Sequence, residues 1–134
     1  MTTEPAIPSP HEAARLSDDE AAAVVERAQF ASDGLLPAII QSHDDNAVLM
    51  LGYMNAEAVR RTLTEGRVTF WSRSRSEYWR KGDTSGNIQL VRSAALDCDG
   101  DTLLVRVHQV GPACHTGARR CFDVDPVITE GADS

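Results

Sequence analysis

The period with which hydrophobic and polar residues alternate changes along the chain, and each change marks the boundary of an expected helix or strand. Two segments suit helices, and seven show the alternation or the short apolar runs that are typical of strands. The expected helices are 21–30 and 56–65. The expected strands are 35–41, 47–53, 68–72, 78–81, 88–97, 102–110 and 121–128. This pattern predicts an α+β fold that is mostly β: a small mixed or antiparallel sheet, or a pseudobarrel, with one or two short helices.

Local signals support both helices. Ser17 and Glu20 have the spacing of a capping box, in which each side chain satisfies the other residue's backbone N–H. Asn55 is a favourable N-cap for the second helix, and Gly66 is a favourable stop after it. Both helix starts are therefore predicted from capping chemistry as well as from apolar spacing.

Two of the expected strands carry more specific predictions. The apolar run of 47–53 is nearly continuous, which is typical of a strand buried on both faces. Pro37 places strand 35–41 at a sheet edge or at a bulge, because proline has no N–H to donate. The polar residues 42–46 join these two strands as a hairpin.

The length of 134 residues favours one domain. Residues 1–16 carry three prolines and little apolar pattern, so a mobile tail is expected there, with a second tail at 129–134 and the domain at 17–128. No apolar run approaches the roughly 20 residues that span a bilayer, and residues 1–10 lack the regions of a secretory signal. We therefore expect a cytoplasmic protein that does not bind membranes.

The formal net charge of -7 argues against nucleic acid as a partner. The charge is unevenly spread, because eight basic and three acidic residues lie between Arg60 and Arg92. That segment carries +5 and the remainder -12. Such a run more often means a solvated charged face. The alternative is a site for an anion of limited size, and the motifs within the segment bear on this choice.

All three cysteines lie in one stretch, at Cys98, Cys114 and Cys121. In a reducing compartment an odd number of cysteines suits metal ligation better than disulfides. Their spacing differs from the Cys-x-x-Cys pairs of a structural zinc ribbon, whereas three protein ligands plus water are the pattern of a catalytic zinc. Such a zinc makes hydroxide available near neutral pH. Ordinary buried cysteines are the alternative.

Acidic residues alternate around the first cysteine, at Asp97, Asp99 and Asp101. In an extended backbone Asp97 and Asp99 point to one face and Cys98 to the other, and a turn at Gly100 can bring Asp101 beside the two acids. Carboxylates suit Mg²⁺ or Ca²⁺, whereas thiolates select zinc. One short segment could thus serve an oxygen site, for which we expect magnesium, and a sulfur site. A solvated acidic turn is the alternative.

A histidine follows the second cysteine directly, at His115. Imidazole suits either a fourth zinc ligand or a general acid/base, and the sequence leaves both roles open. His108 lies within an expected strand and is predicted to be structural.

Residues 72–76 interleave hydroxyl and guanidinium groups, a combination that suits phosphate oxygens. Residues 79–87 place a tryptophan beside cations and a glycine-framed loop, where a base could stack and backbone amides could approach a phosphate. The candidate substrate-binding residues are Ser72, Arg73, Ser74, Arg75, Trp79, Lys81 and Ser85. Together with a zinc-activated water, these motifs suggest hydrolysis of a phosphorylated nucleotide-like molecule.

Five blocks of the chain, in order from about residue 35 to residue 122, resemble the phosphoribosyl-AMP cyclohydrolases of histidine biosynthesis. The blocks are Val48–Asn55, Ser72–Arg75, Trp79–Asn87, Asp97–Asp101, and Gly111–Gly117 with Cys121 and Phe122. The resemblance implies a hydrolase acting on a cyclic amidine. Its reaction opens the adenine ring of phosphoribosyl-AMP between N1 and C6 and gives the formimino-aminoimidazole carboxamide ribonucleotide, the third step of the pathway.

The resemblance also implies a mostly β, intertwined homodimer. Cys114 and Cys121 of one subunit and Cys98 of the partner subunit would hold Zn²⁺, and the three alternating aspartates would bind Mg²⁺. We expect His115 to transfer protons and the basic motifs to hold the two phosphates of the substrate.

Three positions depart from the family pattern: Ser42, Asn46 and His108. None is a proposed metal ligand, but they leave the role of the turn at 43–44 open. A second hypothesis is a zinc-dependent nucleotide deaminase, although the His-x-Glu and Pro-Cys-x-x-Cys signatures of those enzymes do not occur here. A non-catalytic, zinc-stapled binding domain is a third, and it would hold a metal with four protein ligands.

Overall fold

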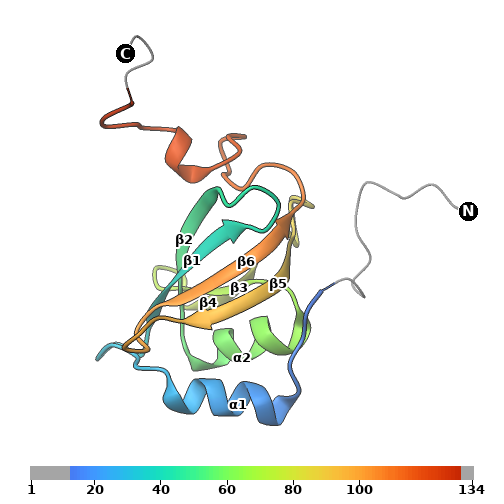
Figure 1. Ribbon diagram of the computed structural model, residues 1–134, viewed down its shortest axis with the longest axis vertical. Coiled ribbons are helices and arrows are strands. Elements are labelled where there is room, and N and C mark those ends of the chain that lie inside the picture. The colour runs from blue at the N-terminus through green and yellow to red at the C-terminus, as the bar shows by residue number, and fades with distance from the viewer. Residues whose placement is uncertain (1–12, 131–134) are drawn as a thin grey trace, which may run out of the picture.

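The computed structural model describes residues 13–130 and shows two helices beside a mostly β body (Figure 1). The helices are α1 (Asp18–Arg27) and α2 (Ala56–Glu65). The strands are β1 (Leu36–Ser42), β2 (Val48–Met54), β3 (Thr69–Ser72), β4 (Glu77–Arg80), β5 (Gln89–Leu96) and β6 (Leu103–Gln109). The predicted α+β class with a dominant sheet is therefore confirmed.

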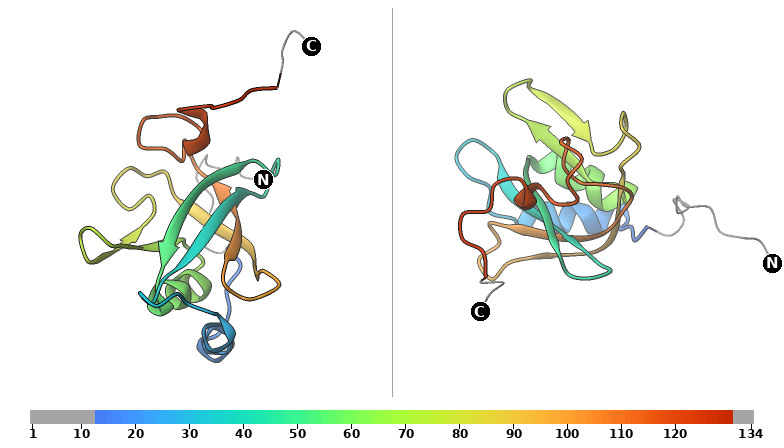
Figure 2. Two further views of the ribbon diagram at one scale, coloured as in Figure 1. Left: turned by 90° about the vertical axis from the view of Figure 1, so that its left-hand side faces the viewer. Right: turned by 90° about the horizontal axis from the view of Figure 1, so that it is seen from above.

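The main sheet has four strands in the order β2-β1-β6-β5. β1 and β6 run parallel and the other neighbours antiparallel, so the sheet is mixed. β3 and β4 form a separate two-stranded sheet, which approaches β5 through a bridge between Arg67 and Leu90 (Figure 2). The strands do not close into a barrel, so of the two predicted forms the mixed sheet is the one observed.

Capping determines where the helices begin. Ser17 Oγ accepts the Glu20 N–H over 3.1 Å and Glu20 Oε1 accepts the Ser17 N–H over 2.9 Å, so the predicted capping box is confirmed. α1 starts directly after this cap, earlier than the predicted 21–30, because a capping box places the first helical residue beside the cap. Asn55 and Gly66 cap α2 as predicted, and Gly66 takes φ 74°.

The core lies between one face of the main sheet and the two helices. Alternate residues of β1 and β6 face it, as a strand period of two requires. Its strand members include Leu36, Ala38, Ile40, Leu103, Val105 and Val107, and its helix members include Ala21, Ala58, Val59 and Leu63. Both helices lie together at one side of the sheet (Figure 1), which leaves the other face, here called the outer face, without a helix over it.

Two predictions about the first hairpin are wrong. β2 is not buried on both faces, because Leu51 is 43% exposed and Tyr53 is 37% exposed. β1 is an interior strand, so Pro37 does not mark an edge, and the irregularity of β1 lies at Ile40–Gln41 instead. Pro37 is tolerated because the pairing of β1 with β6 begins one residue later, at Ala38.

The expected strand at 121–128 is also wrong. Cys121–Asp123 forms a 3-10 turn, in which Arg120 Nε donates to Asp123 Oδ1 over 2.8 Å. The chain beyond it is irregular and exposed, with Val127 91% exposed. Pro126 cannot donate a ladder hydrogen bond, which disfavours a strand here.

The described parts of the expected tails differ from each other. Within the expected N-terminal tail, the Ala14 N–H donates to Val91 O over 2.7 Å and the Leu16 N–H donates to Leu63 O over 2.8 Å, so residues 13–16 contact the body. At the other end, 129–130 is exposed and irregular. The remaining tail residues, 1–12 and 131–134, lie outside the described part. Within that part, no helix has the length and apolar character to cross a membrane.

Candidate active site and metal ligands

Cys114 and Cys121 lie together in the irregular segment that follows β6. The Cys114 N–H donates to Ala118 O over 3.1 Å, which folds the chain between the two cysteines back on itself. Their thiols are free and lie within hydrogen-bonding reach of each other. Cys114 is only 6% exposed, and Cys121 is half-buried. The loop thus brings together two of the three predicted zinc ligands.

The two thiols differ in acidity. Thr116 Oγ1 donates to Cys114 Sγ over 3.1 Å, and this hydrogen bond lowers the pKa of Cys114. Burial raises the pKa of Cys121, and the hydrogen bond with Cys114 adds to the rise. Adjacent thiols of which one ionises readily are a suitable start for binding a thiophilic cation, because the thiolate is the ligand.

The three aspartates form the turn between β5 and β6. One carboxylate oxygen of each lies within 4.8 Å of those of the others, and all three side chains are exposed. Asp97 Oδ1 accepts the N–H of Asp101 over 3.0 Å, which closes the turn. A hydrogen bond with Asp99 raises the pKa of Asp101, with repulsion between the acids adding to it. The acids are clustered, as the geometric prediction required, and crowded carboxylates can hold a divalent cation.

Cys98 does not join the other two cysteines within one chain. It sits exposed among the aspartates at one end of β5 and β6, while Cys114 and Cys121 lie beyond the opposite end of β6 (Figure 1). In the described part of the chain, the only group of three or more acidic, histidine or cysteine ligands is the aspartate cluster. A site that uses all three thiols would need two chains.

A surface hollow of about 590 Å³ gathers part of the basic segment. Ser72, Arg73, Ser74 and Trp79 line it together with Gly52, Tyr53, Phe70 and Trp71. The Arg73 guanidinium lies 4.6 Å from the centre of the Tyr53 ring, so cation and aromatic face share one wall. Tyr53 and Trp71 were not predicted as site residues from the sequence. No alternation of polar and apolar residues marks Tyr53, because the run of β2 is apolar apart from Gly52.

The other predicted substrate residues lie outside this hollow. Arg75 is exposed and lines a neighbouring depression that shares Ser72 and Trp79 with the first. Ser85 is exposed in the glycine-framed loop, where its Oγ accepts the Asn87 N–H over 3.1 Å. Lys81 is buried, at 7% exposure. The structure therefore gathers four of the seven predicted substrate residues around one hollow.

The turn between β1 and β2 contacts the cysteine loop. Asp45 Oδ2 accepts a bond from Arg119 Nη2 over 2.8 Å, and Arg119 lies between Cys114 and Cys121 in sequence. That hydrogen bond lowers the pKa of Asp45. Asp44 Oδ2 lies 3.4 Å from Nδ1 of His108, the histidine predicted to be structural. The turn that the sequence analysis left without a role thus supports the loop that carries the thiols. His115 itself is exposed beside Cys114.

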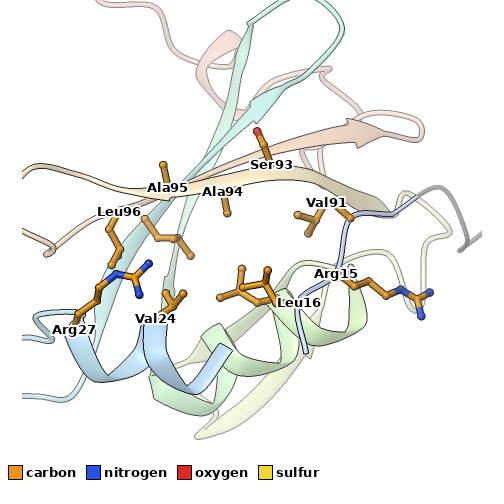
Figure 3. Close-up of a pocket in the computed structure, with 12 residues that line it drawn as sticks. Arg15, Leu16, Val24, Arg27, Val91, Ser93, Ala94, Ala95 and Leu96 are labelled. Carbon is orange, nitrogen blue, oxygen red and sulfur yellow. The ribbon is translucent and has the colours of Figure 1, made fainter. Parts of the chain in front are cut away.

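An apolar cavity of about 320 Å³ lies away from all of these residues, between α1, the segment before it and β5 (Figure 3). Leu16, Val24 and Leu96 line it, with Arg15 and Arg27 at its two sides (Figure 3). None of the described residues that line it carries a thiol, carboxylate or imidazole, which are the groups that the predicted chemistry needs.

The segment that holds the hollow, the aspartate turn and the cysteine loop matches a known family. Residues 50–123 match the family model described as phosphoribosyl-AMP cyclohydrolase. The chain belongs to the phosphoribosyl-AMP cyclohydrolase family. The predicted resemblance is confirmed, and the chain is a hydrolase of this family. The match decides against both the deaminase and the non-catalytic domain.

Relatives within the phosphoribosyl-AMP cyclohydrolase family cover most of the chain. A protein of that name from Clavibacter sepedonicus is 72% identical over 108 residues, which are 81% of this chain and 78% of the relative. One from Paenarthrobacter aurescens is 60% identical over 90% of this chain and 91% of the relative. One from Frankia alni is 56% identical over 99% of this chain and 92% of the relative. The similarity thus extends beyond residues 35–122.

Proposed function

We propose that this chain hydrolyses the N1–C6 bond of the adenine ring of phosphoribosyl-AMP in a zinc-dependent reaction. The product would be the formimino-aminoimidazole carboxamide ribonucleotide of histidine biosynthesis. The observation that carries this proposal is the pair of adjacent free thiols, Cys114 and Cys121, within the segment that matches the family. A cytoplasmic location, where such thiols stay reduced, is part of the proposal.

The donor set fits zinc. Cys114, Cys121 and Cys98 of the partner subunit would hold the ion, and three thiolates leave one position open on a tetrahedral zinc. Soft sulfur ligands select zinc over magnesium. When bound, zinc supplies Lewis-acid chemistry that makes water acidic enough to act as a nucleophile near neutral pH.

His115 would handle the protons of the reaction. Its side chain is exposed next to Cys114, on the same loop as the two thiols. It would take a proton from the water that attacks C6 and return it to N1 as the N1–C6 bond breaks. The aspartate turn would hold Mg²⁺ near the phosphates, because carboxylate oxygens are the ligands that magnesium uses.

The hollow beside β2, β3 and β4 would hold the substrate's rings and phosphates. Tyr53, Trp71 and Trp79 offer aromatic faces there, on which a base or a ribose can pack. Arg73 lines the hollow and Arg75 the adjoining depression, so both guanidinium groups could reach phosphate oxygens.

We further propose that the active form is a homodimer joined through the outer face of the main sheet. Four apolar residues form one row across that face: Leu51 lies opposite Ile39, Ile39 opposite Leu104, and Leu104 opposite Ala95. Val48 and Tyr53 extend the apolar surface along β2 and are 39% and 37% exposed. Uncovered apolar surface of this kind is typical of an interface.

The position of the outer face also suits a shared metal site. It lies between the aspartate turn, which carries Cys98, and the cysteine loop. A second copy rotated by a half-turn on this face would bring each aspartate turn toward the partner's cysteine loop, as two-fold symmetry requires. Each dimer would then hold two complete sites.

Removal of the metal should abolish the activity reversibly. Chelator-treated protein should lose nearly all hydrolysis of phosphoribosyl-AMP, because in this proposal zinc is what acidifies the attacking water. Zinc with magnesium should restore the rate, and magnesium alone should not. The measurement is the change in ultraviolet absorbance as the purine ring opens. Full activity in protein shown by elemental analysis to be free of zinc would contradict the proposal.

A further inference from the structure

Lys81 is a buried cation without a carboxylate partner in the described part of the chain. The residue is 7% exposed, and within residues 13–130 its ammonium forms no ion pair with an aspartate or glutamate. Its only ring contact there is with Trp79, whose centre lies 5.7 Å from Nζ. Taking an ammonium out of water is costly unless a counter-charge stands nearby. The position therefore calls for a negative group that the carboxylates do not supply.

The charges that act on this ammonium are those of the two thiols of the cysteine loop. Burial lowers the pKa of Lys81, and the charges of Cys121 and Cys114 oppose that effect. The charge of Lys81 acts in turn on both sulfurs. Since Cys114 is itself buried, solvent screens this interaction only weakly.

The backbone explains why Lys81 points inward. The Lys81 N–H donates to Val68 O over 2.9 Å, and the Val68 N–H donates to Gln89 O over 3.2 Å. Gln89 is paired in turn with Gln109 on β6. Residues that stand opposite one another on adjacent strands project to the same face. Lys81 therefore shares a face with Val68 and Gln89, which are both fully buried.

The buried residues Lys81, Val68 and Gln89 are linked to the cysteine loop through Gln109. Gln89 Nε2 donates to Gln109 Oε1 over 2.7 Å, and Gln109 Nε2 donates to Val110 O over 3.1 Å, where the segment toward Cys114 begins. A side chain on Gly111 would collide with Asn87 Oδ1, at 2.3 Å, so the segment packs closely on the glycine-framed loop after Lys81. The ammonium and the thiols are thus held by segments that touch.

The net charge of a zinc site with three thiolates explains why a lysine would be buried there. Zn²⁺ and three thiolates sum to one excess negative charge, and a partly buried anion is costly without a counter-ion. Lys81 supplies one positive charge that acts on two of the three sulfurs. In contrast, the exposed Arg73 and Arg75 lie beside the surface hollows, where a phosphate can enter.

We propose that Lys81 is a positioning residue of the cysteine site, whose ammonium supplies the counter-charge with which Cys114 and Cys121 hold zinc, and that it does not bind substrate phosphate. This inference rests on the proposed zinc-dependent function, and it gives Lys81 a different role from the phosphate ligand that the sequence predicted.

The test is the zinc affinity of full-length variants, measured by competition with a chromophoric chelator. Lys81→Met should bind zinc about 10–100-fold more weakly, the usual cost of losing an outer-shell partner. Lys81→Arg should stay within a few-fold of wild type, because it keeps the charge. The matched control is Arg75→Met, which removes an exposed cation of the same basic segment. It should leave zinc affinity unchanged and raise KM.

Lys81→Met with wild-type zinc affinity and a raised KM would overturn the proposal, because that is the signature of a phosphate ligand. Circular dichroism and thermal unfolding show whether each variant folds. If Lys81→Met does not fold, Lys81→Gln replaces it in the comparison of zinc affinity and KM. Wild-type protein that binds no zinc at its cysteines would overturn the proposed function itself. Normal zinc binding by wild type and Lys81→Met alike overturns only the role of Lys81.

Discussion

Cys114→Ala should lose its zinc and nearly all turnover. Cys114 is buried, it is hydrogen-bonded by Thr116, and it lies within reach of the Cys121 thiol, so its loss removes one of the two sulfur ligands that the loop brings together. Loss of an outer-shell partner alone costs about 10–100-fold, and loss of a ligand should cost more. Elemental analysis of the purified variant and its rate with phosphoribosyl-AMP measure both effects.

Thr116→Val is the matched control for this variant. It removes the hydroxyl that donates to Cys114 Sγ but keeps all three thiols. Its zinc content should stay normal at saturating zinc, with an affinity that falls by no more than about 100-fold. A Cys114→Ala protein that turns over at the wild-type rate would refute zinc-dependent hydrolysis at this loop.

Leu51→Glu should convert the proposed dimer into monomers and so abolish activity. Leu51 is 43% exposed in the isolated chain and begins the apolar row of the outer face. A second copy would bury that row, and an unpaired carboxylate in a dry interface costs several kcal/mol. Size-exclusion chromatography with light scattering gives the mass, and the cyclohydrolase assay gives the rate on the same fractions.

Val127→Glu is the control for the change of charge. Val127 is also apolar and is 91% exposed, but it lies outside the outer face. This variant should keep the mass and the activity of the wild type. A Leu51→Glu protein that is monomeric and fully active would show that one chain holds a whole site. A Leu51→Glu dimer as stable as the wild type would show that the interface does not include Leu51.

Features that depend on neighbouring residues could be predicted from the sequence. The ends of α2 follow from Asn55 and Gly66, because an N-cap side chain and a left-handed glycine act within one turn of the helix. The aspartate cluster could be predicted for the same reason, since residues at alternate positions meet when a turn at Gly100 reverses the chain. Cys114 and Cys121 are seven residues apart, and a single loop joins them.

Features that depend on what covers a strand could not be predicted. The apolar run of β2 suggested burial on both faces, but Leu51 and Tyr53 lie on a face that the chain's own helices do not cover. An apolar pattern does not distinguish residues that face the core from residues that form a surface patch. The same ambiguity hid Tyr53 as part of the hollow.

The roles of cations depend on tertiary position in the same way. Lys81 and Arg75 belong to one basic run, yet Lys81 is buried and Arg75 is exposed. The difference comes from the contact of Lys81 with Val68, a residue thirteen positions away. No local signal marks such a pairing, so the sequence predicted a single role for both.

If each active site is shared by two chains, inactive subunits that lack different ligands should complement each other when they are mixed. Cys98→Ala and Cys114→Ala proteins should each be inactive alone. When they are unfolded together and refolded at equal concentrations, half of the dimers should be mixed, and each mixed dimer should hold one intact site. The mixture should therefore regain about a quarter of the wild-type activity. A mixture that stays inactive, while wild-type protein refolded in parallel recovers, would contradict the shared site.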